Sequence, residues 1–260
     1  MMIPPELKRT PVYRALRWTR RRTLTRLESL KLQRRALRGR ALVPEAALEA
    51  CYVALLRDLR MAAPGEPLGD YLEFGVCHGA SLACMHRALA SLAIPEVRLF
   101  GFDSFAGLPP EAETDEGSVW FPGQYRSSLA FTRRFLDRAG VDWGRVTLIK
   151  GWFQDTLTEA AIARHAIRKA SVIMVDCDIY SSARQALAFC EPLIRDRAAI
   201  LFDDWRSAGD LAARGLGEKR AFDEFLAEHP DIAAVEVESY TANAAVFMVS
   251  RTARKQDAAR

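Results

Sequence analysis

The sequence lacks any long hydrophobic run. Nowhere do its 260 residues approach the ~20 consecutive apolar residues that a membrane-spanning helix needs. The first residues also lack the uninterrupted apolar segment of a secretory signal peptide, because arginine recurs throughout them. Cysteine is scarce, with five residues and no CxxC pair, which argues against a disulfide framework. We therefore expect a cytoplasmic protein whose thiols are reduced.

Acidic residues are nearly missing from the first 40 positions. These positions hold 13 Lys or Arg and 2 acidic residues, so their net charge is +11, whereas the rest of the chain has a net charge of −7. Leucines recur along this basic arm at roughly helical intervals: Leu16, Leu24, Leu27, Leu30 and Leu37. Such a helix can bind an anionic membrane surface or nucleic acid. It can also pack against the rest of the chain or a second subunit of a homo-oligomer, and we favour this interpretation.

After the arm, the pattern predicts one helix and then an alternation of strands and helices. The helix runs from Pro44 to about Met61, and a segment rich in Pro and Gly follows it. Seven segments fit strands: 70–76, 97–103, 145–150, 171–176, 198–203, 233–239 and 244–250. This order indicates an α/β fold with a doubly wound, mostly parallel, Rossmann-like sheet and an N-terminal helical extension. We expect a helical part (1–66), the sheet domain (67–251) and a disordered basic tail (252–260).

Two of these strands end in pairs of aspartates. The segment SVIMVDCDIYSS contains Asp176 and Asp178, and the segment AAILFDDW contains Asp203 and Asp204. Open α/β sheets bind ligands outside the carboxyl ends of their strands, and neighbouring strands lie about 4.8 Å apart, so these carboxylates can converge on one cation. An all-oxygen set of this kind suits Mg²⁺. The competing interpretation is that Asp178 only caps the helix that follows it.

A glycine-containing turn, EFGVCHG, follows the first strand. Gly75 and Gly79 permit a tight turn and a close approach of the backbone to a ligand. The central glycine of the usual pattern is missing, because Cys77 takes its place. At the end of the next strand, Asp103 has the position that holds ribose hydroxyls in nucleotide-type sites. Without the full glycine cradle for a pyrophosphate, S-adenosylmethionine fits better than a dinucleotide.

Five sequence blocks then occur in a recognisable order: EFGVCHGAS, GFDSFAGLP, KGWFQDT, VDCDIYSSARQAL and ILFDDW. Over about residues 70–250 the chain resembles the Mg²⁺-dependent sugar O-methyltransferases of antibiotic biosynthesis, the macrocin or TylF type, which have the class I methyltransferase fold. The resemblance implies S-adenosylmethionine and Mg²⁺ as cofactors. It also implies that the methyl acceptor is a hydroxyl, on the sugar of a secondary metabolite or on a glycan.

The resemblance also implies roles for individual residues. It assigns Asp176, Asp203 and Asp204 to the metal, and Asp178 to removal of the acceptor proton. The remaining expected contacts are with the cofactor: Glu73, Gly75 and Gly79 near its methionine and sugar parts, Asp103 and Ser104 at its ribose, Gly151, Trp152 and Asp155 near its adenine, and Asp176 beside it.

Two other functions remain open at this point. The sequence from Asp176 to Asp178 is also a DxD, which glycosyltransferases use to hold a metal and a nucleotide sugar. The chain could instead be a non-catalytic protein whose arm binds a membrane or nucleic acid. The loop at 106–125 has two interpretations of equal weight: a lid that closes Trp120, Phe121 and Tyr125 over substrate, or a mobile surface loop.

Overall fold

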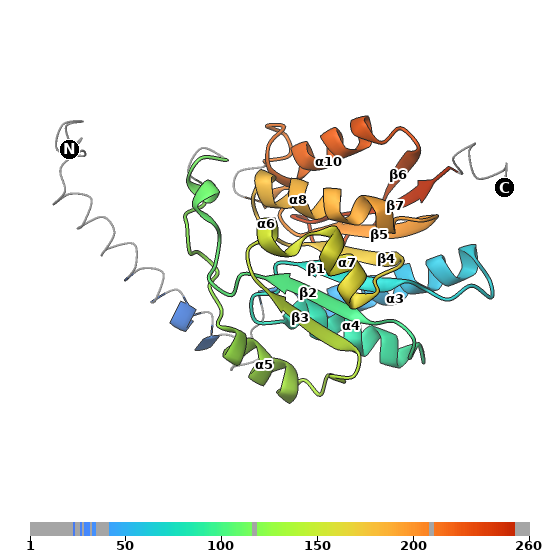
Figure 1. Cartoon of the computed structure of the whole chain (residues 1–260), viewed down its shortest axis with the longest axis horizontal. Helices are drawn as coiled ribbons and strands as arrows, with labels where there is room; N and C mark the ends of the chain where they lie inside the picture. The colour runs from blue at the N-terminus through green and yellow to red at the C-terminus, as the bar shows by residue number, and fades with distance from the viewer. Residues whose placement is uncertain are drawn as a thin grey trace.

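Seven strands form a single sheet in the computed structural model of the chain, which describes residues 42–115, 119–207 and 211–252 and seven separate positions between 23 and 34. The strand order is β3-β2-β1-β4-β5-β7-β6 (Figure 1). Strand β7 is antiparallel to both of its neighbours, and the other pairs are parallel. The predicted α/β sheet is therefore confirmed. The strands are β1 (Asp70–Phe74), β2 (Leu99–Asp103), β3 (Val146–Lys150), β4 (Ala170–Val175), β5 (Arg197–Phe202), β6 (Ile232–Val237) and β7 (Ala245–Arg251).

The central strands are buried on both faces. Every residue of β1 and β4 is buried, as their apolar composition requires in a parallel sheet with helices on both sides. Side chains alternate between the faces, so that Met174 joins one hydrophobic cluster and Val175 the other. The register pairs Phe74 with Val175, and Val175 with Phe202. Three neighbouring strands therefore end level, and the residues after them come to the same edge of the sheet.

Helices cover both faces of this sheet (Figure 1). Each face has its own hydrophobic cluster, which gives the domain three layers. On one face lie α3 (Glu45–Ala62), α4 (Ala80–Ser91) and α5 (Leu129–Arg138). On the other lie α6 (Phe153–Thr156), α7 (Glu159–His165), α8 (Tyr180–Cys190) and α10 (Gly217–Glu228). Two short 3-10 helices, η1 (Pro110–Glu113) and η2 (Glu191–Leu193), complete the described elements.

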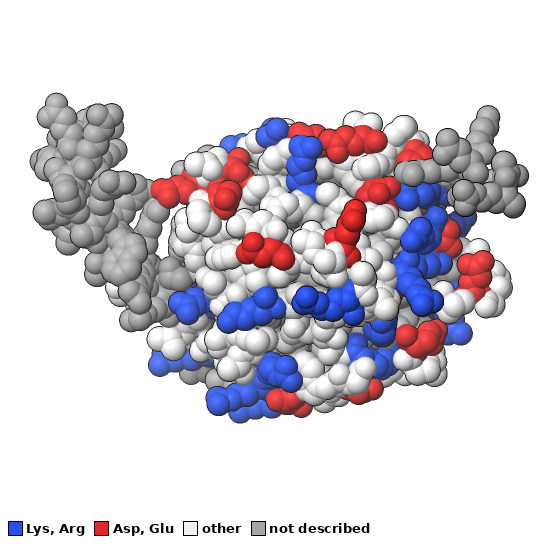
Figure 2. All heavy atoms as spheres, viewed as in Figure 1, with Lys and Arg blue, Asp and Glu red and all other residues white. Residues whose placement is uncertain are grey.

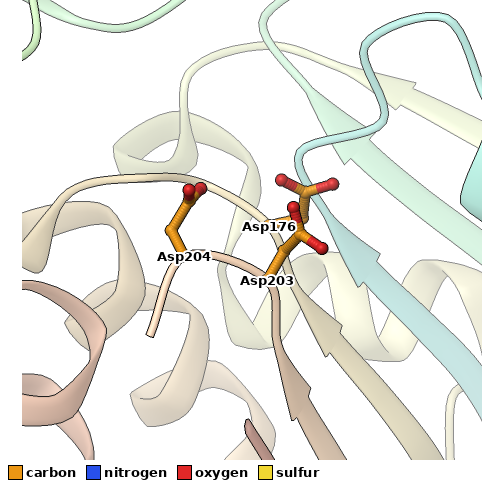
Figure 3. Close-up of side chains that lie close together, drawn as sticks. All are labelled: Asp176, Asp203 and Asp204. Carbon is orange, nitrogen blue, oxygen red and sulfur yellow. The ribbon is translucent and has the colours of Figure 1, made fainter. Parts of the chain in front are cut away.

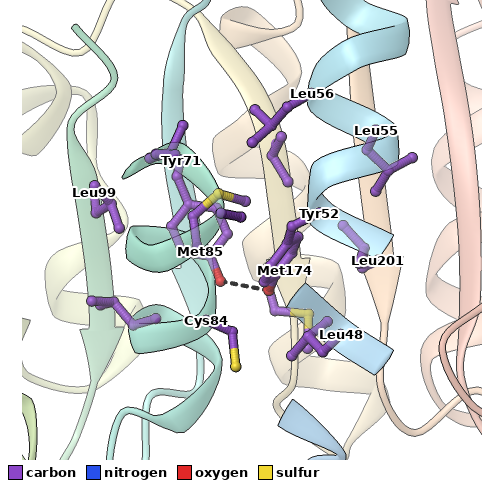
Figure 4. Close-up of a cluster of buried hydrophobic side chains, with 14 of the residues drawn as sticks. Leu48, Tyr52, Leu55, Leu56, Tyr71, Cys84, Met85, Leu99, Met174 and Leu201 are labelled. Atoms are coloured by element: carbon purple, nitrogen blue, oxygen red, sulfur yellow. Dashed lines mark hydrogen bonds between the residues drawn. The ribbon is translucent and has the colours of Figure 1, made fainter. Parts of the chain in front are cut away.

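Helix α3 packs its predicted apolar stripe into the core of the sheet domain. All five stripe residues are buried: Leu48, Tyr52, Leu55, Leu56 and Leu59. The hydroxyls of Tyr52 and Tyr71 form a hydrogen bond of 3.0 Å that joins α3 to β1 (Figure 4). This helix thus shares one core with the sheet, and the expected division of the chain at residue 66 stays a prediction.

One predicted helix is shorter in the structure. The sequence favours a helix over 156–168, but α7 spans only Glu159–His165, and the separate short helix α6 ends at Thr156. The Thr158 side chain accepts a hydrogen bond from the amide of Ala161 (3.2 Å) and so starts a second helix. Ala166 then adopts a left-handed conformation with φ of +49° and ends it. The capping threonine therefore makes the helix begin three residues later than predicted.

Most of the basic arm, and the tail after Thr252, lie outside the described residues. Of the leucines predicted to pack, only Leu27 and Leu30 are described. Both are helical, and they are 49% and 52% exposed. These two side chains are therefore not buried against the rest of this chain, and their packing on a second subunit stays a prediction.

The outer surface carries charges of both signs, and neither sign covers the face shown in Figure 2. Among the helices that the structure describes, none combines the length and the apolar composition that crossing a membrane requires.

Candidate active site

An open cavity lies at the carboxyl edge of the sheet, where the strand order reverses between β1 and β4. Open α/β sheets bind their ligands at such a switch point. The empty volume is about 1230 Å³, part of it open to solvent. The strand ends contribute Gly75, Asp103, Asp176 and Asp203, and the remaining wall comes from residues 42–43, the loop at 107–125, the turn at 151–154 and the start of α8.

Gly75 lies where the turn after β1 passes the end of β4. Its φ is +95°, and an added Cβ would lie 1.7 Å from the carbonyl oxygen of Asp176. Only glycine lets the turn after β1 pass this close to the end of β4. The contact that requires glycine is therefore made within the chain itself. Gly79, with φ of +91°, is buried as the N-cap of α4.

Three carboxylates converge at the ends of β4 and β5. Asp176, Asp203 and Asp204 each offer one oxygen atom, and these oxygens all lie within 4.8 Å of one another. In Figure 3 the three side chains point to the same side of the strands, with the carboxylates of Asp176 and Asp203 next to each other. The structure thus brings together the residues predicted as metal ligands, and their metal stays a prediction.

Burial and neighbouring like charges both raise the pKa values of aspartates in this cluster. Burial, with Asp203 and Asp204 nearby, holds the pKa of Asp176 well above its usual range. Burial first and Asp204 second raise the pKa of Asp203 to about 6. Among the described residues that line the cavity, every charged side chain is acidic. A divalent cation would offset this repulsion, and an all-oxygen donor set suits Mg²⁺, so these residues fit the expected metal.

Asp178 belongs to the acidic cluster and not to the cap of α8. The N-cap of this helix is Ile179, and the amide of Ser181 donates to Asp115 Oδ2 in the loop (2.9 Å). Asp178 is buried, and its φ is +65°, a region that Asp adopts more readily than most residues. A hydrogen bond between the side chains of Asp178 and Asp204 partly offsets the rise that burial causes in the pKa of Asp204. The capping interpretation is therefore wrong.

Asp103 holds the glycine turn in place. Its Oδ2 accepts hydrogen bonds from the amides of Val76 (2.9 Å) and Cys77 (2.7 Å), and its Oδ1 accepts one from Phe105 (2.5 Å). A carboxylate offers about four acceptor positions, so capacity remains for a ribose hydroxyl. Cys77 adopts φ of +48°, and the turn thus keeps a left-handed residue where the usual pattern has glycine.

Glu73 faces the core, on the same side of β1 as Tyr71. The carboxylate is fully buried, and it accepts hydrogen bonds from Tyr71 Oη (2.5 Å) and Ser81 Oγ (2.6 Å). The bond from Ser81 joins β1 to α4 below the glycine turn. Glu73 is not among the residues that line the cavity, so its expected contact with the cofactor stays a prediction that this geometry does not favour.

Glu73 is expected to make the stability of the fold depend on pH. Burial raises its pKa from the usual 4.5 to about 7. Because the folded chain binds this proton more tightly than the unfolded chain, the resulting stabilisation is fully present below about pH 4.5 and is lost as the pH rises through about 7. Relative to Glu73→Gln, the wild type should lose roughly 3 kcal/mol of unfolding free energy over this window. Urea unfolding of the wild type and of Glu73→Gln across this pH window measures the loss. If the difference in unfolding free energy between the two proteins did not change with pH, the raised pKa of Glu73 would be contradicted.

The remaining predicted cofactor residues divide between the cavity and the surface. Ser104, Gly151 and Trp152 line the cavity, together with residues 153–154. Asp155 is exposed on α6 and is not among the lining residues. Its expected position near the adenine stays a prediction, whereas the neighbouring Gln154 lines the cavity.

The loop at 106–125 is packed where the structure describes it, which excludes residues 116–118. Trp120 is only 8% exposed and packs against Ile179 at the start of α8. Its ring also contacts that of Tyr125, with 5.9 Å between the centroids. Together with the bond from Ser181 to Asp115, these contacts pack the described part of the loop beside the cavity, and its role as a lid stays a prediction.

Three side chains that the sequence analysis did not single out contact the aspartates. The Tyr240 hydroxyl donates to Asp203, and the Ser207 hydroxyl donates to Asp204 Oδ1 (2.7 Å). Glu218 Oε2 accepts from the amide of Asp204 (3.1 Å). Of the three, only Glu218 has a sequence signal, an acidic residue in the first turn of a helix, and that signal predicts a helix start and not a site.

The sheet order, the reversed β7 and the cavity between β1 and β4 define a class I methyltransferase fold. Solved structures share it. The O-methyltransferase NovP superposes with a TM-score of 0.64 at 21% identity, over 82% of this chain and 81% of that chain. The calicheamicin methyltransferase CalS11 gives a TM-score of 0.60 at 21% identity, over 78% of this chain and 77% of that chain.

The chain belongs to the macrocin-O-methyltransferase (TylF) family, whose sequence profile matches residues 56–229. It is 30% identical over 165 residues to an 8-demethyl-8-(2,3-dimethoxy-alpha-L-rhamnosyl)-tetracenomycin-C 4'-O-methyltransferase of Streptomyces olivaceus, which covers 61% of this chain and 58% of the relative. It is 28% identical over 166 residues to the mycinamicin III 3''-O-methyltransferase of Micromonospora griseorubida, which covers 61% of each. The chain thus spans about three fifths of these relatives, and the expected family is confirmed.

Proposed function

We propose that the protein transfers a methyl group from S-adenosylmethionine to a hydroxyl of a sugar, carried by a secondary metabolite or a glycan, with the help of Mg²⁺. The observation that carries this proposal is the convergence of Asp176, Asp203 and Asp204 in the cavity that also contains the Gly75 turn. The family supports it, because the two curated relatives are named as O-methyltransferases for a rhamnosyl-tetracenomycin and for mycinamicin III.

The cofactor would occupy the part of the cavity between the glycine turn and the turn at 151–154. Asp103 fixes the backbone of the first turn and has acceptor capacity left for a ribose hydroxyl. Trp152 and the neighbouring Phe153 provide aromatic surface for a flat base. The site needs no phosphate cradle for this cofactor, which is consistent with Cys77 in the glycine pattern.

The residues of the chain divide the chemical work. When bound, the cofactor supplies an activated methyl group, and the cation supplies positive charge that makes a sugar hydroxyl more acidic. Asp176, Asp203 and Asp204 would hold the cation. Asp178, which adjoins them at the start of α8, would take the proton of the acceptor hydroxyl. The wall formed by the loop at 107–125 would limit water and orient the acceptor.

Calorimetry and a methyl-transfer assay test this proposal. The folded protein is expected to bind S-adenosylmethionine and its demethylated product. It should methylate a member of a panel of neutral glycosides in the presence of Mg²⁺, lose this activity in chelator and recover it when Mg²⁺ is restored. A folded protein that binds neither form of the cofactor would contradict the proposal. A rise in melting temperature with a nucleotide sugar instead would favour the glycosyltransferase interpretation of the DxD.

A further inference from the structure

Two hydroxyl groups each occupy one oxygen of an aspartate at the end of β5. The Tyr240 hydroxyl donates to Oδ1 of Asp203. The Ser207 hydroxyl lies 2.7 Å from Oδ1 of Asp204 and 3.0 Å from its carbonyl oxygen, so its single proton is shared between them. In each carboxylate one oxygen, Oδ1, is therefore engaged by a hydroxyl, and each aspartate offers one oxygen to the cluster.

Tyr240 reaches the site from a distant part of the chain. It lies between β6 and β7, and the register pairs Ala245 at the start of β7 with Phe202 at the end of β5. The turn between the last two strands is therefore held at the carboxyl end of β5. The Tyr240 ring is 7% exposed and belongs to the same hydrophobic cluster as Leu201, so the core fixes the position of its hydroxyl.

Asp204 is restrained at two points. Ser207 engages its carboxylate, and Glu218 at the start of α10 accepts a hydrogen bond from its amide. Glu218 is 1% exposed, so this bond lies out of water, where it is strongest. The two residues fix the side chain and the backbone of Asp204 respectively.

We propose that Tyr240 and Ser207 are positioning residues that turn Asp203 and Asp204 into one-oxygen ligands of a divalent cation. The inference rests on the proposed function only in that such a cation binds. A hydroxyl on one oxygen restricts rotation of the carboxylate and directs the other oxygen to the cluster. Groups that orient ligating carboxylates in this way typically contribute 10–100-fold to metal affinity.

A titration of the full chain with Mn²⁺ tests this proposal. Electron paramagnetic resonance measures the Mn²⁺ that stays unbound in solution and so gives the affinity. Tyr240→Phe keeps the buried ring and removes only the hydroxyl, and it should weaken Mn²⁺ affinity by about 10–100-fold. Ser207→Ala should weaken it in the same direction. Neither substitution should change the affinity for S-adenosylmethionine, because neither residue lines the cofactor part of the cavity.

The matched control is Tyr71→Phe. It removes a bond of the same kind, from a buried tyrosine hydroxyl to a carboxylate, but the acceptor is Glu73 in the core. Its Mn²⁺ affinity should equal that of the wild type. A folded Tyr240→Phe protein with wild-type Mn²⁺ affinity overturns the proposal, and if that variant does not fold, Ser207→Ala decides by the same criterion. Wild-type protein that binds no Mn²⁺ overturns the metal role itself, and this inference with it.

Discussion

The Asp178→Asn variant is expected to lose about 10²–10⁴-fold in kcat, the usual contribution of a positioned general base. Asparagine has nearly the same shape as aspartate and also tolerates the left-handed conformation found at this position, so the backbone should not change. The amide cannot accept the proton of the acceptor hydroxyl. Single-turnover methyl transfer at saturating cofactor and Mg²⁺ measures the loss.

The Asp178 prediction requires that binding survives. Affinities for S-adenosylmethionine and for Mg²⁺ should stay close to wild type, because the three predicted ligands are Asp176, Asp203 and Asp204. The comparison variant is Asp176→Asn, which should weaken Mg²⁺ binding and recover part of its turnover in excess Mg²⁺. Equal loss of Mg²⁺ affinity in the two variants would show that Asp178 is a ligand and that the base is another group.

Gly75→Ala is expected to weaken the binding of both S-adenosylmethionine and Mg²⁺ and to destabilise the fold by about 3 kcal/mol or more. The added methyl group would lie 1.7 Å from the Asp176 carbonyl oxygen, and a backbone atom directly after a central strand cannot move aside cheaply. The left-handed conformation of Gly75 adds about 1–2 kcal/mol of strain. Urea unfolding gives the stability, and calorimetry gives the affinities for S-adenosylmethionine and Mg²⁺.

Gly140→Ala separates the clash from the backbone strain. Gly140 also has a positive φ, +73°, but an added Cβ there would meet no atom within 4 Å. This variant should lose only the strain of about 1–2 kcal/mol and keep both affinities. If Gly75→Ala were no worse than Gly140→Ala, the contact between the glycine turn and β4 would not be what requires glycine.

The sequence predicts most of the fold because its strongest signals are long and periodic. The buried runs of β4 and β5 and the stripe on α3 each repeat over several residues, and tertiary packing agrees with them. The boundary between α6 and α7 depends instead on a single capping residue, Thr158, with no glycine or proline to mark it. Boundaries set by one side chain are therefore where the prediction of the fold is wrong.

The aspartates of the site were predictable because they directly follow buried strands, so topology alone brings them to one edge. The same argument does not extend to Glu73, whose expected contact with the cofactor stays a prediction. It lies one residue before the strand ends, and the alternation of side chains turns it to the core. The contact of Tyr240 with Asp203 was not predictable. The two residues are 37 positions apart in the sequence, and their contact depends on where the last two strands pair.

The position of β7 has a consequence for the order in which the site is completed during synthesis. Residues 245–251 insert between β5 and β6, so β5 is an unpaired edge until they have left the ribosome. Until then, the pairing of β7 with β5 does not yet hold the turn that carries Tyr240. The carboxylates at the end of β5 therefore acquire their final orientation among the last steps of folding, and a nascent chain that stops before β7 would have the cofactor turn but not a finished acidic cluster.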